Sequence, residues 1–352
     1  MPHSIILFIL IDYCLKLLES EEASAQYFEI SLSNLNHEDS NYKTFTLSYA
    51  FWLYYTSTEP LPSYTSYKYF KLLDTVLIVY GPDPNIVKVI DESRFLMDVS
   101  SITNFSFSDS FDEINYAYVA PILFRELAYI SDPSVGIFKK YMNSPIVIKD
   151  LISHWSALKK WDKPSFWVEL AGHRFFPVEI GCHYQDIYWT QEIIQLNDFF
   201  QKYVFNINND QIAYIAQHNW IHQIPLLARD FEILDLCEIF LDPCMDNVIT
   251  HMWFGVKGTF TPLHYDKYNN ILTQIVGQKY ILLVDPVYSN IFTDGFNNSS
   301  KIVDENISDH LQKLGIPFNE VILKPGDSLF IPSNWWHQVK SLNFSISISF
   351  WF

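Results

Sequence analysis

The stretch Phe344-Ser-Ile-Ser-Ile-Ser-Phe350 places an apolar residue at every second position. This period of two is typical of a β-strand that buries one face. Similar short runs fill the last hundred residues, and Gly277-Gln278 and Lys324-Pro-Gly-Asp327 between them are hairpin-turn signals. The strands predicted in this way are 252–255, 262–266, 271–276, 280–284, 321–323, 328–331, 337–340 and 344–350. Such a block of antiparallel strands predicts a double-stranded β-helix, the jelly-roll or cupin barrel.

Upstream of this block, from about residue 123, helical and strand patterns mix. The strands expected there are 144–149, 176–180 and 212–217, and the helices are 197–203 and an aromatic helix through His154, Trp155 and Trp161. The fold class is therefore α+β, with a C-terminal double-stranded β-helix and flanking helices at residues 121–352.

Residues 1–120 alternate apolar stretches with breaks rich in Ser, Asn and Asp. This pattern favours several helices joined by loops, two of them at 67–80 and 84–95. We therefore predict a mainly helical N-terminal region at 1–120. The apolar run Ile5–Ile11 is interrupted by Asp12 and is too short to span a bilayer, so we expect a core helix rather than a targeting or membrane segment.

Composition limits the partners that the chain can bind. The 352 residues are 49% hydrophobic and 17% aromatic, which predicts a folded protein. The formal net charge of -17 opposes direct binding to nucleic acid and favours a basic protein or peptide partner. The four cysteines form no CxxC pair, so a reducing compartment, nuclear or cytoplasmic, is expected. No membrane association is predicted.

The motif Pro262-Leu-His264-Tyr-Asp266 has the spacing of a metal site on a strand. A period of two puts His264 and Asp266 on one face, where both can reach the same ion. His337 follows in Phe330-Ile-Pro-Ser-Asn-Trp-Trp-His337, at the start of a later predicted strand. Two histidines and one carboxylate form the open triad of non-haem iron(II) oxygenases, whereas zinc favours a closed tetrahedral set.

Lys279 starts the predicted strand that follows the Gly277-Gln278 turn. A lysine at such a position normally points to solvent. If the barrel closes, however, Lys279 can point inward and pair with a carboxylate of a bound dicarboxylate.

These motifs together resemble the Jumonji-C oxygenases, and the likeness covers roughly residues 123 to 352. It rests on segments spread along that part of the chain: Phe176–Gly181, Tyr214–His218, Gln223–Pro225, Trp253–Asp266, Asn270–Tyr280, Phe330–His337 and Ser349–Phe352. The first 120 residues match the family only loosely. A long loop at 288–319, rich in Asn, Asp and Ser, is a further departure from the pattern.

The resemblance implies Fe(II) as cofactor, with 2-oxoglutarate and dioxygen as cosubstrates. It assigns the iron to His264, Asp266 and His337. It assigns the distal carboxylate of 2-oxoglutarate to Lys279, helped by Tyr214, Thr261 and Asn270, and the substrate pocket to Glu179, Trp189, Gln217, Trp253 and Trp351. On pattern alone, Tyr214, Trp253 and Trp351 fit equally well as packing aromatics, and Thr261 and Asn270 as turn or strand-edge residues.

Three functions follow from these observations. The first is hydroxylation of an arginine side chain in a protein, because a carboxylate at Glu179 suits a guanidinium. The second is demethylation of a methyl-lysine, for which an aromatic cage is the usual recognition device. The third is a non-catalytic barrel that serves as a protein-interaction scaffold, against which the intact triad and Lys279 argue.

Overall fold

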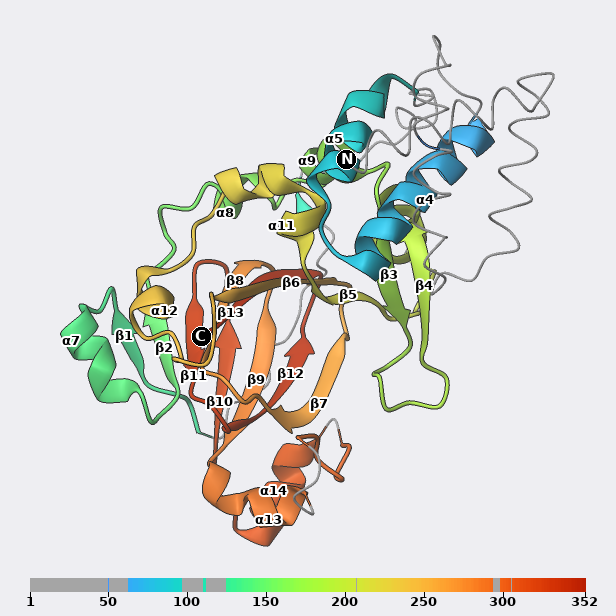
Figure 1. The fold of residues 1–352 in the computed structure, drawn as a ribbon. Coiled ribbons are helices and arrows are strands. Elements are labelled where there is room, and N and C mark those ends of the chain that lie inside the picture. The colour runs from blue at the N-terminus through green and yellow to red at the C-terminus, as the bar shows by residue number, and fades with distance from the viewer. Residues whose placement is uncertain are drawn as a thin grey trace, which may run out of the picture.

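The computed structural model describes residues 50, 63–96, 110–111, 125–206, 208–293, 298–304 and 306–352. Within them, two β-sheets form the centre of the molecule and helices surround them (Figure 1). The predicted helix at Ile5–Ile11 and the predicted boundary at residue 120 lie outside the described residues. None of the described helices has the length and apolar character to cross a membrane.

The larger sheet has nine strands in the order β1-β2-β11-β8-β13-β6-β5-β3-β4, and the smaller has four in the order β10-β9-β12-β7. Their bounds are β1 Tyr129–Ser131, β2 Ile146–Lys149, β3 Phe175–Ile180, β4 Thr190–Gln195, β5 Ala213–His218, β6 Ile249–Gly255, β7 Phe260–Tyr265, β8 Asn270–Val276, β9 Lys279–Val284, β10 Phe318–Leu323, β11 Ser328–Ile331, β12 Trp336–Ser341 and β13 Ser345–Trp351. Strands β11-β8-β13-β6 face β10-β9-β12-β7, which is the double-stranded β-helix.

The predicted barrel strands are all present, each within a few residues of its expected bounds. Gly277 and Gly326 adopt φ of 70° and 92° in the two predicted turns, a conformation that glycine adopts without a steric penalty. At Gly277 a Cβ would lie 1.9 Å from the carbonyl oxygen of Phe344, so the β8–β9 turn also needs glycine for space.

Helices lie outside the barrel (Figure 1). Their bounds are α4 Ser63–Tyr80, α5 Pro84–Glu92, α7 Val135–Phe138, α8 Ala157–Lys160, α9 Pro164–Ala171, α10 Leu196–Phe199, α11 Trp220–Gln223, α12 Asp235–Ile239, α13 Ser289–Phe292 and α14 Ile307–Leu314. Short 3₁₀ turns occur at η1 Ser93–Leu96, η3 Lys139–Tyr141, η5 Pro225–Arg229 and η6 Pro286–Tyr288, and η4 Phe200–Val204 is a π-helix. The predicted helix at 67–80 corresponds to α4, and the one at 84–95 to α5 with η1.

Two predictions outside the barrel are wrong. The aromatic helix expected through His154, Trp155 and Trp161 is reduced to the single turn α8. Trp155 precedes α8 and Trp161 follows it, and both side chains are buried without a continuous helix between them. The stretch at 288–319 is not an unstructured loop, since α13 and α14 bury Phe292, Ile307 and Leu311 against the smaller sheet.

Among the residues that the structure describes, three apolar clusters hold the elements together. The largest lies between the larger sheet and helices α8–α12 and contains the buried Trp161, Trp167 and Trp220. A second, with Leu272, Ile281 and Leu329, closes one part of the barrel interior. The third joins α13 and α14 to the smaller sheet. The remaining space inside the barrel, between the two sheets, forms the cavity described next.

Candidate active site

His264, Asp266 and His337 converge inside the barrel. His264 lies on β7 opposite His337 on β12, and Asp266 directly follows β7. The Nε2 atom of His264 lies 4.0 Å from Oδ1 of Asp266, and Nε2 of His337 lies 3.7 Å from Oδ2. One ligand atom from each residue lies within 4.8 Å of the others. One metal ion can therefore bind all three.

The two histidines have their Nε2 atoms free for a metal. Nδ1 of His264 lies 2.8 Å from the carbonyl oxygen of Pro262, and Nδ1 of His337 lies 3.0 Å from that of Trp335. A carbonyl oxygen only accepts hydrogen bonds, so both Nδ1 atoms carry a proton, and in the neutral form of either ring Nε2 is the nitrogen with a lone pair for a metal. Burial, and then the neighbouring His337, lower the pKa of His264 to about 4, which keeps it neutral.

The carboxylate of Asp266 is oriented by the last strand of the barrel. Nε1 of Trp351, on β13, donates a 2.8 Å hydrogen bond to Oδ2 of Asp266. The Trp351 ring also lies 6.3 Å from that of Trp253. Hydrogen bonds of this kind fix a ligating carboxylate before the metal binds.

A cavity of about 360 Å³ opens beside the triad. Its walls bring together eight residues that the sequence pointed to outside the triad: Glu179, Tyr214, Gln217, Trp253, Thr261, Asn270, Lys279 and Trp351. Trp189 does not line the cavity. Its Nε1 instead donates a 3.2 Å hydrogen bond to Oε2 of Glu179, so it acts on the cavity through that carboxylate.

Lys279 lies at the inner end of the cavity and is only 1% exposed. Its Nζ donates to the hydroxyl of Tyr214 at 3.2 Å and lies 5.6 and 5.7 Å from the ring centres of Tyr214 and Trp253. Within the described ranges this lysine forms no ion pair, and burial lowers its pKa to about 7. The buried Asn270 also lines the cavity, and the nitrogen of its side-chain amide can donate a hydrogen bond to a ligand. Both groups suit a bound carboxylate.

Tyr214 reaches Lys279 because β6 leaves space for its ring. A Cβ on Gly255 would lie 2.4 Å from Cδ2 of Tyr214. Burial, and then the nearby Glu179, raise the pKa of Tyr214 well above its ordinary value, so the phenol stays neutral and can donate its proton to a ligand.

The outer part of the cavity carries Glu179 on β3 and Gln217 on β5. Burial raises the pKa of Glu179, and the hydrogen bond from Trp189 opposes that shift. Gln217 adopts φ of 48° at an irregularity in the pairing of β5 with β6. A carboxylate and an amide that face an open cavity suit a ligand with several hydrogen-bond donors.

Residues near the opening of the cavity were missed by the sequence reasoning. Ser299 forms a β-bridge with His264, and the backbone nitrogen of Ser300 donates to the carbonyl oxygen of Leu263. The hydroxyl of Tyr184, from the β3–β4 connection, lies 3.4 Å from that of Ser299. The contact of Tyr184 with Ser299 joins segments more than a hundred residues apart, and neither of these two residues lies in a motif, so no local signal pointed to them.

The donor set identifies the kind of metal site. Two imidazoles and one carboxylate leave coordination positions open, which suits iron(II). The pocket beside them holds the buried Lys279 and the side-chain amide of Asn270, whose N–H groups can donate to a dicarboxylate. Fold and site thus define a double-stranded β-helix protein with an open metal triad and an adjacent anion pocket.

Comparison with known proteins agrees with this class. Residues 137–352 match the model of the cupin-like domain family. Lysine-specific demethylase 8 of Xenopus tropicalis is 35% identical over 246 residues, which is 66% of this chain and 54% of that protein. The chain belongs to the cupin-like Jumonji-C family, as its motifs predicted.

Two more relatives show how far the likeness extends. Jumonji C domain-containing protein 5 of Drosophila melanogaster is 33% identical, over 59% of this chain and 54% of that protein. JmjC domain-containing protein D of Dictyostelium discoideum is 37% identical, over 61% of this chain and 54% of that protein. The chain thus spans about half the length of the curated relatives it matches.

Proposed function

We propose that the protein is an Fe(II)- and 2-oxoglutarate-dependent dioxygenase that acts on a side chain of a protein substrate. The observation that carries this proposal is the cavity with an open metal triad at one side and the unpaired Lys279 at its inner end. A keto acid that binds the metal at one end needs a cation for its distal carboxylate.

Each part of the cavity has a task in this proposal. His264, Asp266 and His337 hold the iron, which when bound supplies the redox chemistry that couples oxidation of 2-oxoglutarate to oxidation of a substrate C–H bond by dioxygen. Lys279 binds the distal carboxylate, with hydrogen bonds from Tyr214, Thr261 and Asn270. The surrounding residues hold the substrate so that one C–H bond faces the metal.

The substrate side of the cavity favours arginine. Glu179 is half-buried beside Gln217, and together they offer a carboxylate and an amide to a guanidinium with five N–H donors. Trp253 and Trp351 offer aromatic faces on which a planar cation can stack. The net charge of -17 favours approach of a basic peptide. We propose hydroxylation of an arginine side chain.

Demethylation of a methyl-lysine is the second candidate, because relatives of this chain are named lysine-specific demethylases. The same tryptophans would then serve as the cage for a methylated ammonium. Mass spectrometry of treated basic peptides separates the two reactions. One added oxygen on arginine supports hydroxylation, and a lost methyl group with release of formaldehyde supports demethylation.

The experiment that tests the dioxygenase is succinate formation from 2-oxoglutarate by protein loaded with Fe(II) under anaerobic conditions and then exposed to air. An arginine-containing basic peptide should stimulate turnover, and His264→Ala should abolish it. His310→Ala is the matched control, because His310 is an exposed histidine of α14 away from the cavity. Absence of turnover despite bound iron and 2-oxoglutarate would refute the enzyme and favour the scaffold.

A further inference from the structure

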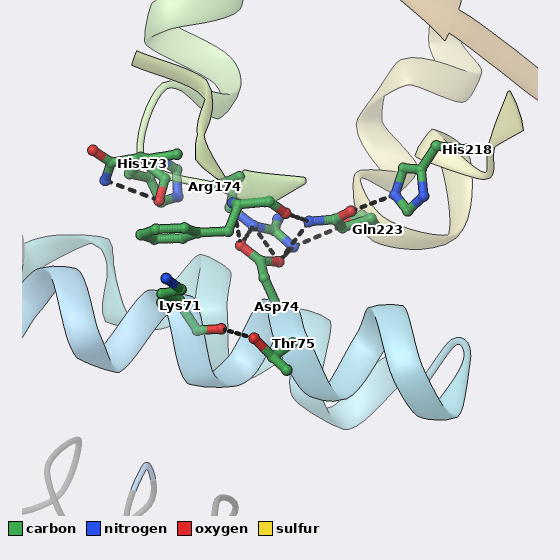
Figure 2. A network of polar contacts seen from close by, with 9 residues as sticks. Lys71, Asp74, Thr75, His173, Arg174, His218 and Gln223 are labelled. Atoms are coloured by element: carbon green, nitrogen blue, oxygen red, sulfur yellow. Dashed lines mark hydrogen bonds and ion pairs between the residues drawn. The ribbon is translucent and has the colours of Figure 1, made fainter. Parts of the chain in front are cut away.

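A buried polar network joins α4 to the barrel domain, outside the cavity (Figure 2). Asp74 of α4 is fully buried and accepts hydrogen bonds from Nε and Nη2 of Arg174 at 3.0 and 2.7 Å. The backbone nitrogen of Phe175 donates to the other oxygen of Asp74 at 2.8 Å. This ion pair fixes α4 against the start of β3.

Gln223, at the end of α11, extends the network toward the cavity. Its Nε2 donates to Oδ1 of Asp74 and to the carbonyl oxygen of Phe175, both at 2.7 Å. Its Oε1 accepts a 2.6 Å hydrogen bond from Nε2 of His218. Figure 2 shows the side chain of Gln223 between Arg174 and His218. The amide of Gln223 therefore uses both of its ends, one toward α4 and one toward β5.

His218 is the last residue of β5 and directly follows Gln217. The pairing of β5 with β6 shifts register between Ile215 and His218, which is a β-bulge. Within it Gln217 adopts φ of 48°, a left-handed conformation that costs a residue with a Cβ about 1 kcal/mol or more. Such a conformation persists only where its surroundings enforce it. The hydrogen bond between His218 and Gln223 restrains the residue next to Gln217 and so helps to hold this conformation.

We propose that Gln223, anchored by Asp74 of α4, is a positioning residue for the substrate side of the cavity. It holds His218, and through His218 the bulge that presents Gln217 to the cavity. This inference rests on the proposed function only in giving Gln217 a substrate to contact. It makes α4, which lies in the N-terminal region of the sequence, part of the support for peptide binding.

The main test compares Gln223→Met with wild type. Methionine keeps the length and apolar volume of the side chain but loses all three hydrogen bonds of the amide, of which the one from His218 supports the bulge. The KM for the peptide should rise about tenfold, the scale of one lost hydrogen bond. The KM for 2-oxoglutarate should stay within about twofold, because Lys279 and Asn270 do not contact the network. The control is Thr75→Val, since the buried hydroxyl of Thr75 donates to Lys71 within α4.

A double-variant cycle tests whether Gln223 acts through Gln217. Gln217→Ala alone should raise the peptide KM, and adding Gln223→Met should raise it no further. A second pair covers the case in which Gln223→Met does not fold. His218→Leu removes the donor to Gln223, whereas His218→Gln keeps a nitrogen donor near the position of Nε2, so only the first should raise the peptide KM.

Three kinetic results would overturn the inference. They are a wild-type peptide KM in a folded Gln223→Met, an equal rise in both KM values, and additive effects in the double variant. If the wild-type protein turns over no peptide, amide hydrogen exchange still tests whether Gln223 holds the bulge, independently of the proposed function. The inference is supported if the backbone amides of residues 213–218 exchange faster in Gln223→Met than in Thr75→Val while those of residues 249–255 exchange at the same rate in both. Equal exchange rates at 213–218 in the two variants overturn it.

Discussion

Arg174 and Lys279 are both buried cations, with 2% and 1% of their surface exposed, but their surroundings differ. Arg174 faces Asp74 through two nitrogens and also donates to the carbonyl oxygen of Gln223. Lys279 has the hydroxyl of Tyr214 and two aromatic faces, and its pKa falls to about 7. The first cation is neutralised by the protein itself, whereas the second is left for a ligand to neutralise. Burial alone therefore does not distinguish a structural charge from a binding site, but the presence of a partner does.

The largest expected effect is on stability, and it separates the two cations directly. Asp74→Ala leaves the Arg174 guanidinium buried without its counter-ion and should lower the free energy of unfolding by about 3–5 kcal/mol. Lys279→Met should leave the ligand-free protein as stable as wild type or more so, because it removes a buried amine that has no counter-ion among the described residues. Urea denaturation followed by tryptophan fluorescence measures both.

The control for this comparison is Glu92→Ala, which breaks the exposed ion pair with Lys88 on α5 and should change the free energy of unfolding by less than about 0.5 kcal/mol. Equal destabilisation by Asp74→Ala and Lys279→Met would contradict the distinction drawn between the two cations.

The next effect is on ligand affinity. Lys279→Met should raise the dissociation constant of 2-oxoglutarate by about 30-fold or more, since loss of one member of a buried charge pair costs about 2 kcal/mol or more. Saturating 2-oxoglutarate should stabilise wild type but not this variant, which a thermal shift measures. Lys324→Met, at the exposed β10–β11 turn, is the matched control. A wild-type affinity in Lys279→Met would remove the main support for the 2-oxoglutarate site.

A smaller effect is expected on metal affinity. The protein holds the carboxylate of Asp266 through a hydrogen bond from Trp351, and the same carboxylate can still bind the metal ion. Trp351→Phe keeps an aromatic ring, though a smaller one, but removes the hydrogen bond to Asp266, and it should weaken iron binding by about tenfold. Trp253→Phe is the control, because Nε1 of Trp253 donates to Ser349 rather than to a metal ligand. Competition with a chelator measures both. Equal loss in the two variants would mean that packing, rather than the hydrogen bond, supports the metal site.

The same contrast explains what the sequence could predict. Alternating residues repeat locally, so the barrel strands follow from the pattern, and the spacing of His264 and Asp266 along one strand places both on one face. The position of Lys279 after a glycine turn predicted a partner supplied by a ligand. The pair of Asp74 and Arg174 joins residues a hundred positions apart. Its one local sign is an aspartate within the apolar sequence of α4, which does not identify the partner.

Trp155 and Trp161 illustrate the opposite failure. The aromatic-rich sequence predicted one helix through both residues, but they lie on either side of the single turn α8, and both are buried there. Tertiary packing of large aromatic side chains does not require that they share a helix. Tyr184 and Ser299 were not predicted because their contact at the cavity joins two separate loops that connect strands of the sheets. Pattern reasoning therefore succeeds where the structure repeats and fails where single contacts join distant segments.

The smallest effect is the pH dependence of ligand binding, and it tests the cause of the difference between the cations. Burial lowers the pKa of Lys279 from 10.5 to about 7 in the ligand-free protein. Above that pH the amine is mainly neutral and must take up a proton to pair with a carboxylate. The dissociation constant of 2-oxoglutarate should therefore rise between pH 7.5 and 8.5, by less than about tenfold for that unit.

The sign of the linkage follows from the same pKa. Because the unfolded chain binds a proton that folded, ligand-free Lys279 lacks between pH 7 and 10.5, this residue makes ligand-free wild type more stable relative to Lys279→Met as pH rises through that range. Bound 2-oxoglutarate should reverse the preference by favouring the charged amine. Calorimetric titration at pH 8.5 in two buffers of different ionisation enthalpy should show proton uptake for wild type and none for Lys279→Met. A pH-independent dissociation constant without proton uptake would mean that the lysine is already charged, and so already neutralised by the protein as Arg174 is.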